Sequence, residues 1–117
     1  STPFQMALAD YLKWNLEFCD QLGSFYQAKR DYFCTLLQDS RFRFTPSNGT
    51  YFQLVDYTAI SSKDDMAFVK ELTQEKGVAA IPLAPFYREA PDTRIVRFCF
   101  CKDGSTLERA AEILRAL

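Results

Sequence analysis

Residues 94–102 read Arg-Ile-Val-Arg-Phe-Cys-Phe-Cys-Lys, and this stretch predicts a strand from Ile95 to Cys101. Side chains alternate along a strand, so the stretch has an all-apolar face and a face with one charge. The apolar face carries Val96, Phe98 and Phe100. The other face carries Ile95, Arg97, Cys99 and Cys101. We expect helices to cover the apolar face, which leaves Arg97 facing solvent or another domain.

The charge of Arg97 in an apolar strand needs an explanation. A guanidinium cannot lose its proton, so burying it without a partner is very unfavourable. Its planar fork of donors matches a carboxylate in bidentate fashion, which indicates a ligand that carries a carboxylate. The structural alternative stays open: Arg97 is exposed, or it pairs with Asp56 or Glu89.

Composition restricts the class of protein. The chain has 117 residues, 48% of them hydrophobic, which is enough for one domain with a core. The formal charge of −1 comes from interspersed acids and bases, so we expect no nucleic-acid partner. Apolar runs are too short to cross a bilayer and no signal-peptide pattern is present, so we expect no membrane partner and a cytoplasmic location.

Few residues offer catalytic or metal chemistry. The four cysteines have no histidine beside them, so we expect reduced thiols and no metal site. The lack of histidine also removes the commonest general base. No lysine has the small, hydroxyl-rich surroundings of a cofactor lysine, so the chain shows no catalytic residue.

The first 38 residues predict two helices. Thr2 is the expected N-cap of the first helix, with Pro3 at its first position. The pattern is interrupted at residues 22–24, and a second helix is expected from Ser24 to about Gln38. Its inner face is predicted to carry Phe25, Ala28, Tyr32, Thr35 and Leu36.

Strands and helices alternate in the remainder. Residues 42–45 and 50–57 predict strands joined by a turn at 46–49. A third helix is expected from residues 62–65 to Gly77, followed by a short strand, 78–81, that Pro82 ends. A capping box at residues 105–108 opens the last helix, whose inner stripe is Leu107, Ala110, Ala111 and Leu114.

This order predicts an α+β fold with a small, mostly antiparallel sheet packed against helices. We expect a single domain over residues 1–117, with a helical segment at 1–38 and the sheet with its helices at 41–117. The loop at 82–91 is stiffened by Pro82 and Pro85 and carries Phe86, so it can wall a ligand pocket. A tightly packed crossover is the alternative for this loop.

Motifs in chain order are similar to one known family. They are Thr2-Pro3-x-Gln5-x-Ala7-Leu8-Ala9-Asp10, Phe25-Tyr26-x-x-Lys29-Arg30-Asp31, Gly49-Thr50-Tyr51-Phe52, Val55-Asp56-Tyr57, Gly77-Val78-Ala79-Ala80-Ile81-Pro82-Leu83 and Arg97-Phe98-Cys99-Phe100. Together they resemble the C-terminal small domain of class I/II pyridoxal-phosphate aminotransferases of fold type I. The resemblance is strongest to the branch of methionine and kynurenine aminotransferases.

The resemblance implies a role for several residues. It implies that Arg97 binds the α-carboxylate of an amino-acid substrate, and that Ile81, Pro82 and the following loop with Phe86 line the substrate pocket. It also implies pyridoxal 5'-phosphate as cofactor and a homodimeric full-length enzyme that uses 2-oxo acids as acceptors. The cofactor lysine belongs to the family's large domain and matches no position here, so the chain alone is expected to be inactive.

The substrate stays open among methionine-like amino acids, glutamine, and aromatic amino acids or kynurenine. A free-standing amino-acid-binding or regulatory domain without catalysis is the alternative function. A third hypothesis is an interaction module that docks on a partner through its N-terminal helices.

Overall fold

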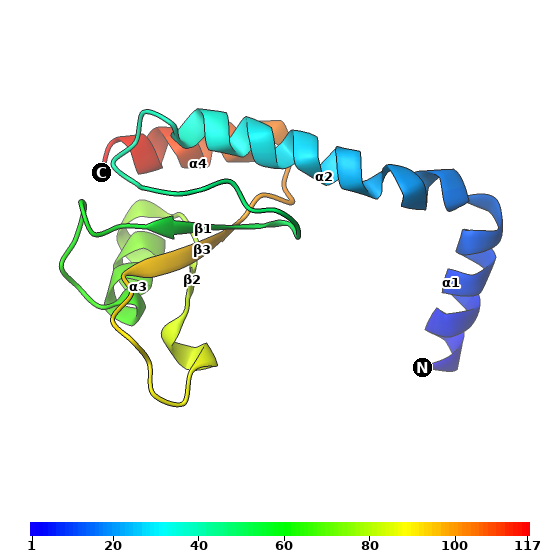
Figure 1. Cartoon of the computed structure of the whole chain (residues 1–117), viewed down its shortest axis with the longest axis horizontal. Helices are drawn as coiled ribbons and strands as arrows, with labels where there is room; N and C mark the ends of the chain where they lie inside the picture. Colours follow the sequence, from blue (N-terminus) through cyan, green and yellow to red (C-terminus); the bar gives the residue numbers. More distant parts are fainter.

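The computed structural model describes residues 1–117 and has four α-helices and a three-stranded antiparallel sheet (Figure 1). The elements in chain order are α1 (Thr2–Trp14), α2 (Leu16–Leu37), β1 (Phe52–Asp56), α3 (Asp65–Lys76), β2 (Ile81–Pro82), the 3-10 turn η1 (Ala84–Phe86), β3 (Ile95–Cys99) and α4 (Gly104–Arg115). This arrangement confirms the predicted α+β class.

The strand predicted from Ile95 to Cys101 is the centre of the sheet, in the order β1-β3-β2, and it ends two residues early, at Cys99. The other predicted strands are shorter than expected. Residues 42–45 contribute only an isolated bridge between Arg43 and Asp56. The strand expected at 78–81 begins to pair only at Ile81 and includes Pro82. Proline is tolerated there because β2 lies at the sheet edge, where a missing N–H breaks no ladder.

The core is formed by the sheet with helices α2, α3 and α4, and α2 and α4 run side by side (Figure 1). Val96, Phe98 and Phe100 are all buried there, which confirms the predicted apolar face of β3. The predicted inner stripe of α4 is also confirmed, since Leu107, Ala111 and Leu114 are buried and Ala110 packs against them.

The break between the first two helices was predicted at the wrong place. The chain bends at Asn15, with φ −131° and ψ 30°, and α2 then continues without interruption through Gly23. A glycine inside a helix costs only about 1 kcal/mol, so one glycine does not end a helix that packing supports. At the true break, the Asn15 side-chain amide donates to the Tyr11 carbonyl at 2.9 Å.

The predicted inner face of α2 is also mostly wrong, since only Leu36 of its five residues packs against the core. Phe33 and Leu37 are 2% and 0% exposed, whereas Phe25 and Tyr32 are 45% and 40% exposed. Aromatic residues occur on several sides of this helix, so hydrophobic spacing alone does not identify the side that meets the sheet.

Two of the predicted helix starts shift by one or two residues. Helix α1 has Ser1 rather than Thr2 as N-cap, and α4 has Asp103 rather than Ser105. The predicted limits of α3 are confirmed. The Asp64 carboxylate accepts a hydrogen bond from the Ala67 amide at 2.8 Å, and Gly77 ends the helix with φ 73°, a value that favours glycine.

Helix α1 stands apart from this core and contacts only the start of α2 (Figure 1). It buries none of its residues, and its exposed apolar side chains are Phe4, Met6, Leu8, Tyr11 and Trp14. None of the helices is both long and apolar enough to span a membrane.

The buried Tyr57 makes the stability of the core depend on pH in the alkaline range. Its ring stacks on Phe68 with centroids 4.0 Å apart, and its hydroxyl donates to the Lys63 carbonyl at 2.9 Å. Burial, helped by the nearby carboxylate of Asp65, raises the pKa of Tyr57 to about 12.

We expect Tyr57→Phe to flatten the alkaline loss of stability. A phenol whose pKa is higher folded than unfolded stabilises the fold fully below about pH 10 and stops doing so as pH rises toward about 12. At neutral pH the free energy of unfolding of the variant is expected to be about 1 kcal/mol lower, because the hydrogen bond to the Lys63 carbonyl is lost. Urea unfolding from pH 8 to 12 measures both effects, with the exposed Tyr87→Phe as control. An alkaline limb as steep in Tyr57→Phe as in the wild type contradicts the assignment.

Candidate functional site

The face of the sheet opposite the core is not covered by helices. Directly paired residues of antiparallel strands share a face, so the register places Leu54 and Ile81 on either side of Arg97. We call this surface the open face, and its strand residues are Phe52, Leu54, Asp56, Ile81, Ile95, Arg97 and Cys99. Arg97 is at its centre, as the alternation along the sequence predicts.

Two aromatic rings hold the Arg97 guanidinium. Its Cζ lies 4.0 Å from the ring centroid of Phe52, on β1, and 5.3 Å from that of Phe86, at the end of η1. A guanidinium over a ring face gains cation–π attraction while its N–H groups stay available in the guanidinium plane. The rings therefore position the charge without neutralising it.

Arg97 has no anionic partner within the chain. Its Nε is buried and makes no hydrogen bond, and none of the ion pairs involves it. The alternative partners Asp56 and Glu89 are thus not used. The Asp56 carboxylate instead accepts the Thr58 amide at 2.6 Å, and hydrogen bonds from Thr58, with smaller help from nearby arginines, lower its pKa. A guanidinium without an ion-pair partner in the chain is a candidate to bind an anion from outside these residues.

The structure brings two of the three predicted pocket residues to Arg97. Ile81 lies directly opposite it, and Phe86 contacts its guanidinium. Pro82 pairs with Val96 instead, so it faces the helix side and lines a shallow hollow against α3.

Sequence reasoning missed Phe52 and Leu54, which β1 brings to the same surface. Strand β1 is separated from β3 by helix α3 and strand β2, so no local spacing shows which of its faces meets Arg97. The alternation within residues 50–57 could have divided this segment into two faces, but only the register assigns one of them to the site.

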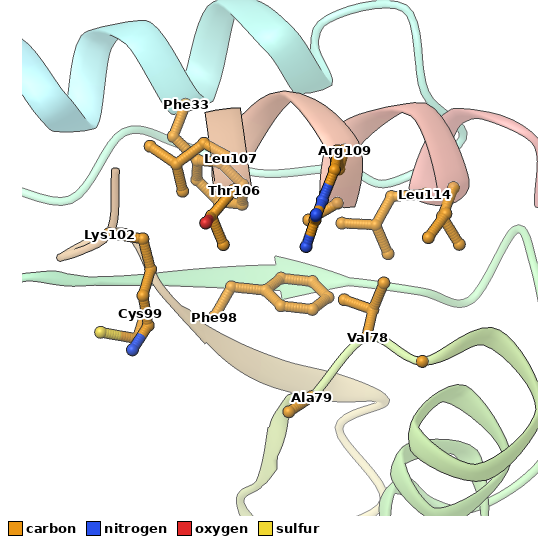
Figure 2. A pocket seen from close by; sticks show the side chains of 13 residues that line it. Phe33, Val78, Ala79, Phe98, Cys99, Lys102, Thr106, Leu107, Arg109 and Leu114 are labelled. Carbon is orange, nitrogen blue, oxygen red and sulfur yellow. The ribbon is translucent and has the colours of Figure 1, made fainter. Parts of the chain in front are cut away.

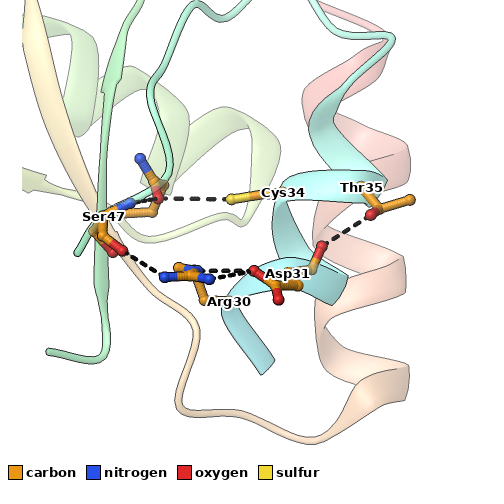
Figure 3. A network of polar contacts seen from close by, with 6 residues as sticks. Arg30, Asp31, Cys34, Thr35 and Ser47 are labelled. Atoms are coloured by element: carbon orange, nitrogen blue, oxygen red, sulfur yellow. Dashed lines mark hydrogen bonds and ion pairs between the residues drawn. The ribbon is translucent and has the colours of Figure 1, made fainter. Parts of the chain in front are cut away.

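A network of polar contacts fixes β1 and hence Phe52 (Figure 3). Arg30 of α2 donates to the Ser47 carbonyl at 2.9 Å and pairs with Asp31 at 2.7 Å. The buried Gln53 amide accepts the Ser47 amide at 3.0 Å and donates to the Thr45 carbonyl at 2.9 Å. The loop before β1 is thereby tied to helix α2 on one side and to its own strand on the other.

The loop after β2 is fixed from α3. The Asp65 carboxylate Oδ2 accepts the backbone amides of Leu83 and Ala84, each at 2.7 Å. These amides begin η1, which ends at Phe86. Arg97 thus lies between two aromatic residues whose backbones are each held by buried polar groups.

A cavity of about 240 Å³ lies on the other side of the sheet, below α4 (Figure 2). Its apolar lining includes Phe33, Val78, Phe98, Leu107, Ile113 and Leu114. Phe98 is on the face opposite Arg97, so most of this cavity lies on the core side of the sheet, and Cys99 is the one lining residue that belongs to the open face.

Comparison with known proteins identifies the family. The family model for aminotransferase class I and II matches residues 1–114. The chain belongs to this aminotransferase family. This chain is 49% identical to the methionine aminotransferase of Escherichia coli over 117 residues. It is 30% identical to the mouse kynurenine–oxoglutarate transaminase 3 over 135 aligned residues.

Solved structures agree with this assignment. The crystal structure of an E. coli protein identified as a methionine aminotransferase superposes on this chain with a TM-score of 0.91 at 49% identity, and the match covers 99% of this chain. N-succinyldiaminopimelate aminotransferase of Mycobacterium tuberculosis superposes with a TM-score of 0.86 at 34% identity, over 97% of the chain. The aminotransferase chain spans about 30% of the length of these relatives.

The lysines of the aminotransferase chain do not fit an attachment site for the pyridoxal phosphate that the family implies. A Schiff-base lysine needs a desolvated amine with a lowered pKa. Lys29 is the one lysine that is not exposed, and its Nζ donates to the Lys102 carbonyl at 2.8 Å. Lys63 pairs with Glu71, whose hydrogen bond and charge raise its pKa. Neither Lys29 nor Lys63 therefore has the environment of a Schiff-base lysine.

Proposed function

We propose that the protein containing this chain is a pyridoxal-phosphate-dependent aminotransferase that transfers an amino group from an amino acid to a 2-oxo acid. Within it, Arg97 binds the α-carboxylate of the substrate. The observation that carries this proposal is the Arg97 guanidinium itself, which is held by two rings and has no ion-pair partner in the chain. A carboxylate completes both the charge and the hydrogen bonds of such a group.

The role of Arg97 in the reaction is positioning. Two parallel hydrogen bonds from a planar fork fix both the place and the orientation of a carboxylate. The α-carbon beside that carboxylate is the atom whose bonds change, so holding the carboxylate sets its approach to the reacting groups. Pyridoxal phosphate, when bound, withdraws electrons from that carbon. This chain supplies the guanidinium of Arg97 that holds the substrate carboxylate.

The surroundings of Arg97 support an uncharged substrate side chain. Leu54 and Ile81 flank it, and Phe52 and Phe86 contact it, so the nearest surfaces are apolar. Methionine-like amino acids, glutamine, and aromatic amino acids or kynurenine all suit such a surface. The relatives named for methionine and kynurenine are consistent with this range.

We place this chain as one domain of the longer protein, with a helical segment at residues 1–38 and the sheet and helices at 41–117. The family implies a large domain and a homodimer. The exposed apolar side chains of α1, which include Phe4 and Trp14, support contact with further protein.

The test compares the whole protein with the isolated chain of residues 1–117. We expect the whole protein with pyridoxal phosphate to convert methionine, glutamine or kynurenine and a 2-oxo acid into the exchanged pair. The isolated chain should show no transfer, and mass spectrometry after borohydride reduction with stoichiometric cofactor should find no added mass. Absence of transfer by the whole protein with every donor contradicts the proposal. Arg97-dependent binding of free methionine by the isolated chain would favour the amino-acid-sensing alternative.

A further inference from the structure

Phe86 is placed beside Arg97 without being packed into the core. Its side chain is 64% exposed, yet its ring centroid lies 5.3 Å from the Arg97 Cζ. An exposed ring has few contacts that could set its position, so its place depends on the backbone that carries it. That backbone is η1, a single 3-10 turn closed by hydrogen bonds from the Phe86 amide to the Leu83 carbonyl and from the Tyr87 amide to the Ala84 carbonyl.

One side chain holds the start of this turn. Leu83 is the N-cap of η1 but gives it no side-chain hydrogen bond, so the first amides of the turn need another acceptor. Asp65 supplies it: a single carboxylate oxygen accepts both the Leu83 and the Ala84 amides at 2.7 Å. Asp65 is 8% exposed, so these charge-assisted bonds are shielded from water.

Asp65 is not needed as the cap of its own helix. The neighbouring Asp64 is the N-cap of α3 and accepts the Ala67 amide at 2.8 Å. Two adjacent carboxylates at the start of one helix thus do different work. Asp64 accepts a hydrogen bond from a free amide in the first turn of α3, whereas Asp65 accepts hydrogen bonds from the amides at the start of η1.

We propose that Asp65 is a positioning residue that acts through η1 to hold Phe86 against Arg97, and that it thereby tunes the affinity for the substrate carboxylate. The proposal rests on the function proposed above for Arg97. The stem of η1, strand β2, is set by the pairing of Ile81 with Arg97, and the start of the turn is set by Asp65. Loss of Asp65 leaves the stem in place and releases the ring.

The experiment uses the whole protein with Asp65→Ala, Asp65→Asn and the control Asp64→Ala. Two quantities are measured: the KM and kcat for the amino-acid donor, and amide hydrogen exchange in peptides spanning residues 80–90. Asp65→Ala is expected to speed exchange at Leu83 and Ala84 about tenfold or more and to raise KM about tenfold, with a smaller change in kcat. Asp65→Asn keeps a neutral acceptor, so its exchange rates and its KM should fall between those of the wild type and those of Asp65→Ala. Asp64→Ala should leave both quantities within about twofold.

A double-mutant cycle tests the route. If Asp65 acts through Phe86, Asp65→Ala adds no further rise in KM to a Phe86→Ala variant. Full additivity overturns the proposal, as does equal KM in Asp64→Ala and Asp65→Ala, because the effect is then one of helix stability. Should Asp65→Ala fail to fold, wild-type exchange and wild-type KM in Asp65→Asn overturn it.

The exchange measurement is independent of the function proposed for Arg97. If Arg97→Ala leaves substrate affinity unchanged, the carboxylate assignment fails, and the positioning role in substrate binding fails with it. Faster exchange in Asp65→Ala would then still show the anchoring of η1. Unchanged exchange in Asp65→Ala with a normal effect of Arg97→Ala overturns the role of Asp65 alone.

Discussion

Replacing Arg97 by alanine is expected to lower kcat/KM of the whole protein for amino-acid donors by about two orders of magnitude or more. Each charge-assisted hydrogen bond contributes about 1.5–3 kcal/mol, and the planar fork offers two to one carboxylate. Arg97→Lys keeps the charge but not the fork, so a loss between wild type and Arg97→Ala is expected. Steady-state kinetics with methionine and with a 2-oxo acid acceptor measure the effect.

The matched control is Arg43→Ala. Arg43 also lies beside the sheet, opposite Asp56, but its side chain is exposed and makes no cation–π contact with either ring that holds Arg97. Its removal should leave kcat/KM within about twofold, as is usual for surface substitutions. Similar losses in both variants would mean that net charge, rather than a bound carboxylate, controls the reaction.

The second large effect concerns stability. Phe33→Ala is expected to lower the free energy of unfolding of the chain by roughly 3–5 kcal/mol, the usual loss for a buried aromatic residue. Phe33 is 2% exposed and packs edge-on against Phe98, with ring centroids 6.2 Å apart. Because small domains have only about 5–15 kcal/mol of stability, this one change can unfold much of the population. Urea unfolding followed by circular dichroism measures it.

Phe25→Ala on the same helix is the control. Phe25 is 45% exposed. Its only aromatic pair is with Tyr26, and its only cation–π contact is with Lys29, both on the same helix. A loss below about 1 kcal/mol is expected. The hydrophobic spacing of the sequence predicts the reverse order, with Phe25 inside. A larger loss for Phe25→Ala than for Phe33→Ala would therefore favour the sequence-based face over the observed one.

These cases show what local pattern can decide about the fold. Alternation in residues 94–102 predicts the buried and open faces of β3 correctly, because period two is a property of any strand. The cap residues Asp64 and Gly77 predict the limits of α3 for an equally local reason. The inner face of α2 was not predictable in this way, since packing decides it, and no glycine or proline in the sequence marks the break at Asn15.

The sequence by itself determined the fold class, the family resemblance and the exceptional position of Arg97, because these depend on residue type and short-range order. Only the tertiary structure decided which residues join Arg97. Phe52 arrives through the register of β1 on β3, and Phe86 through a turn that Asp65 holds from another helix. Such contacts join segments far apart in the chain, and spacing along the sequence carries no information about them until the strands are paired.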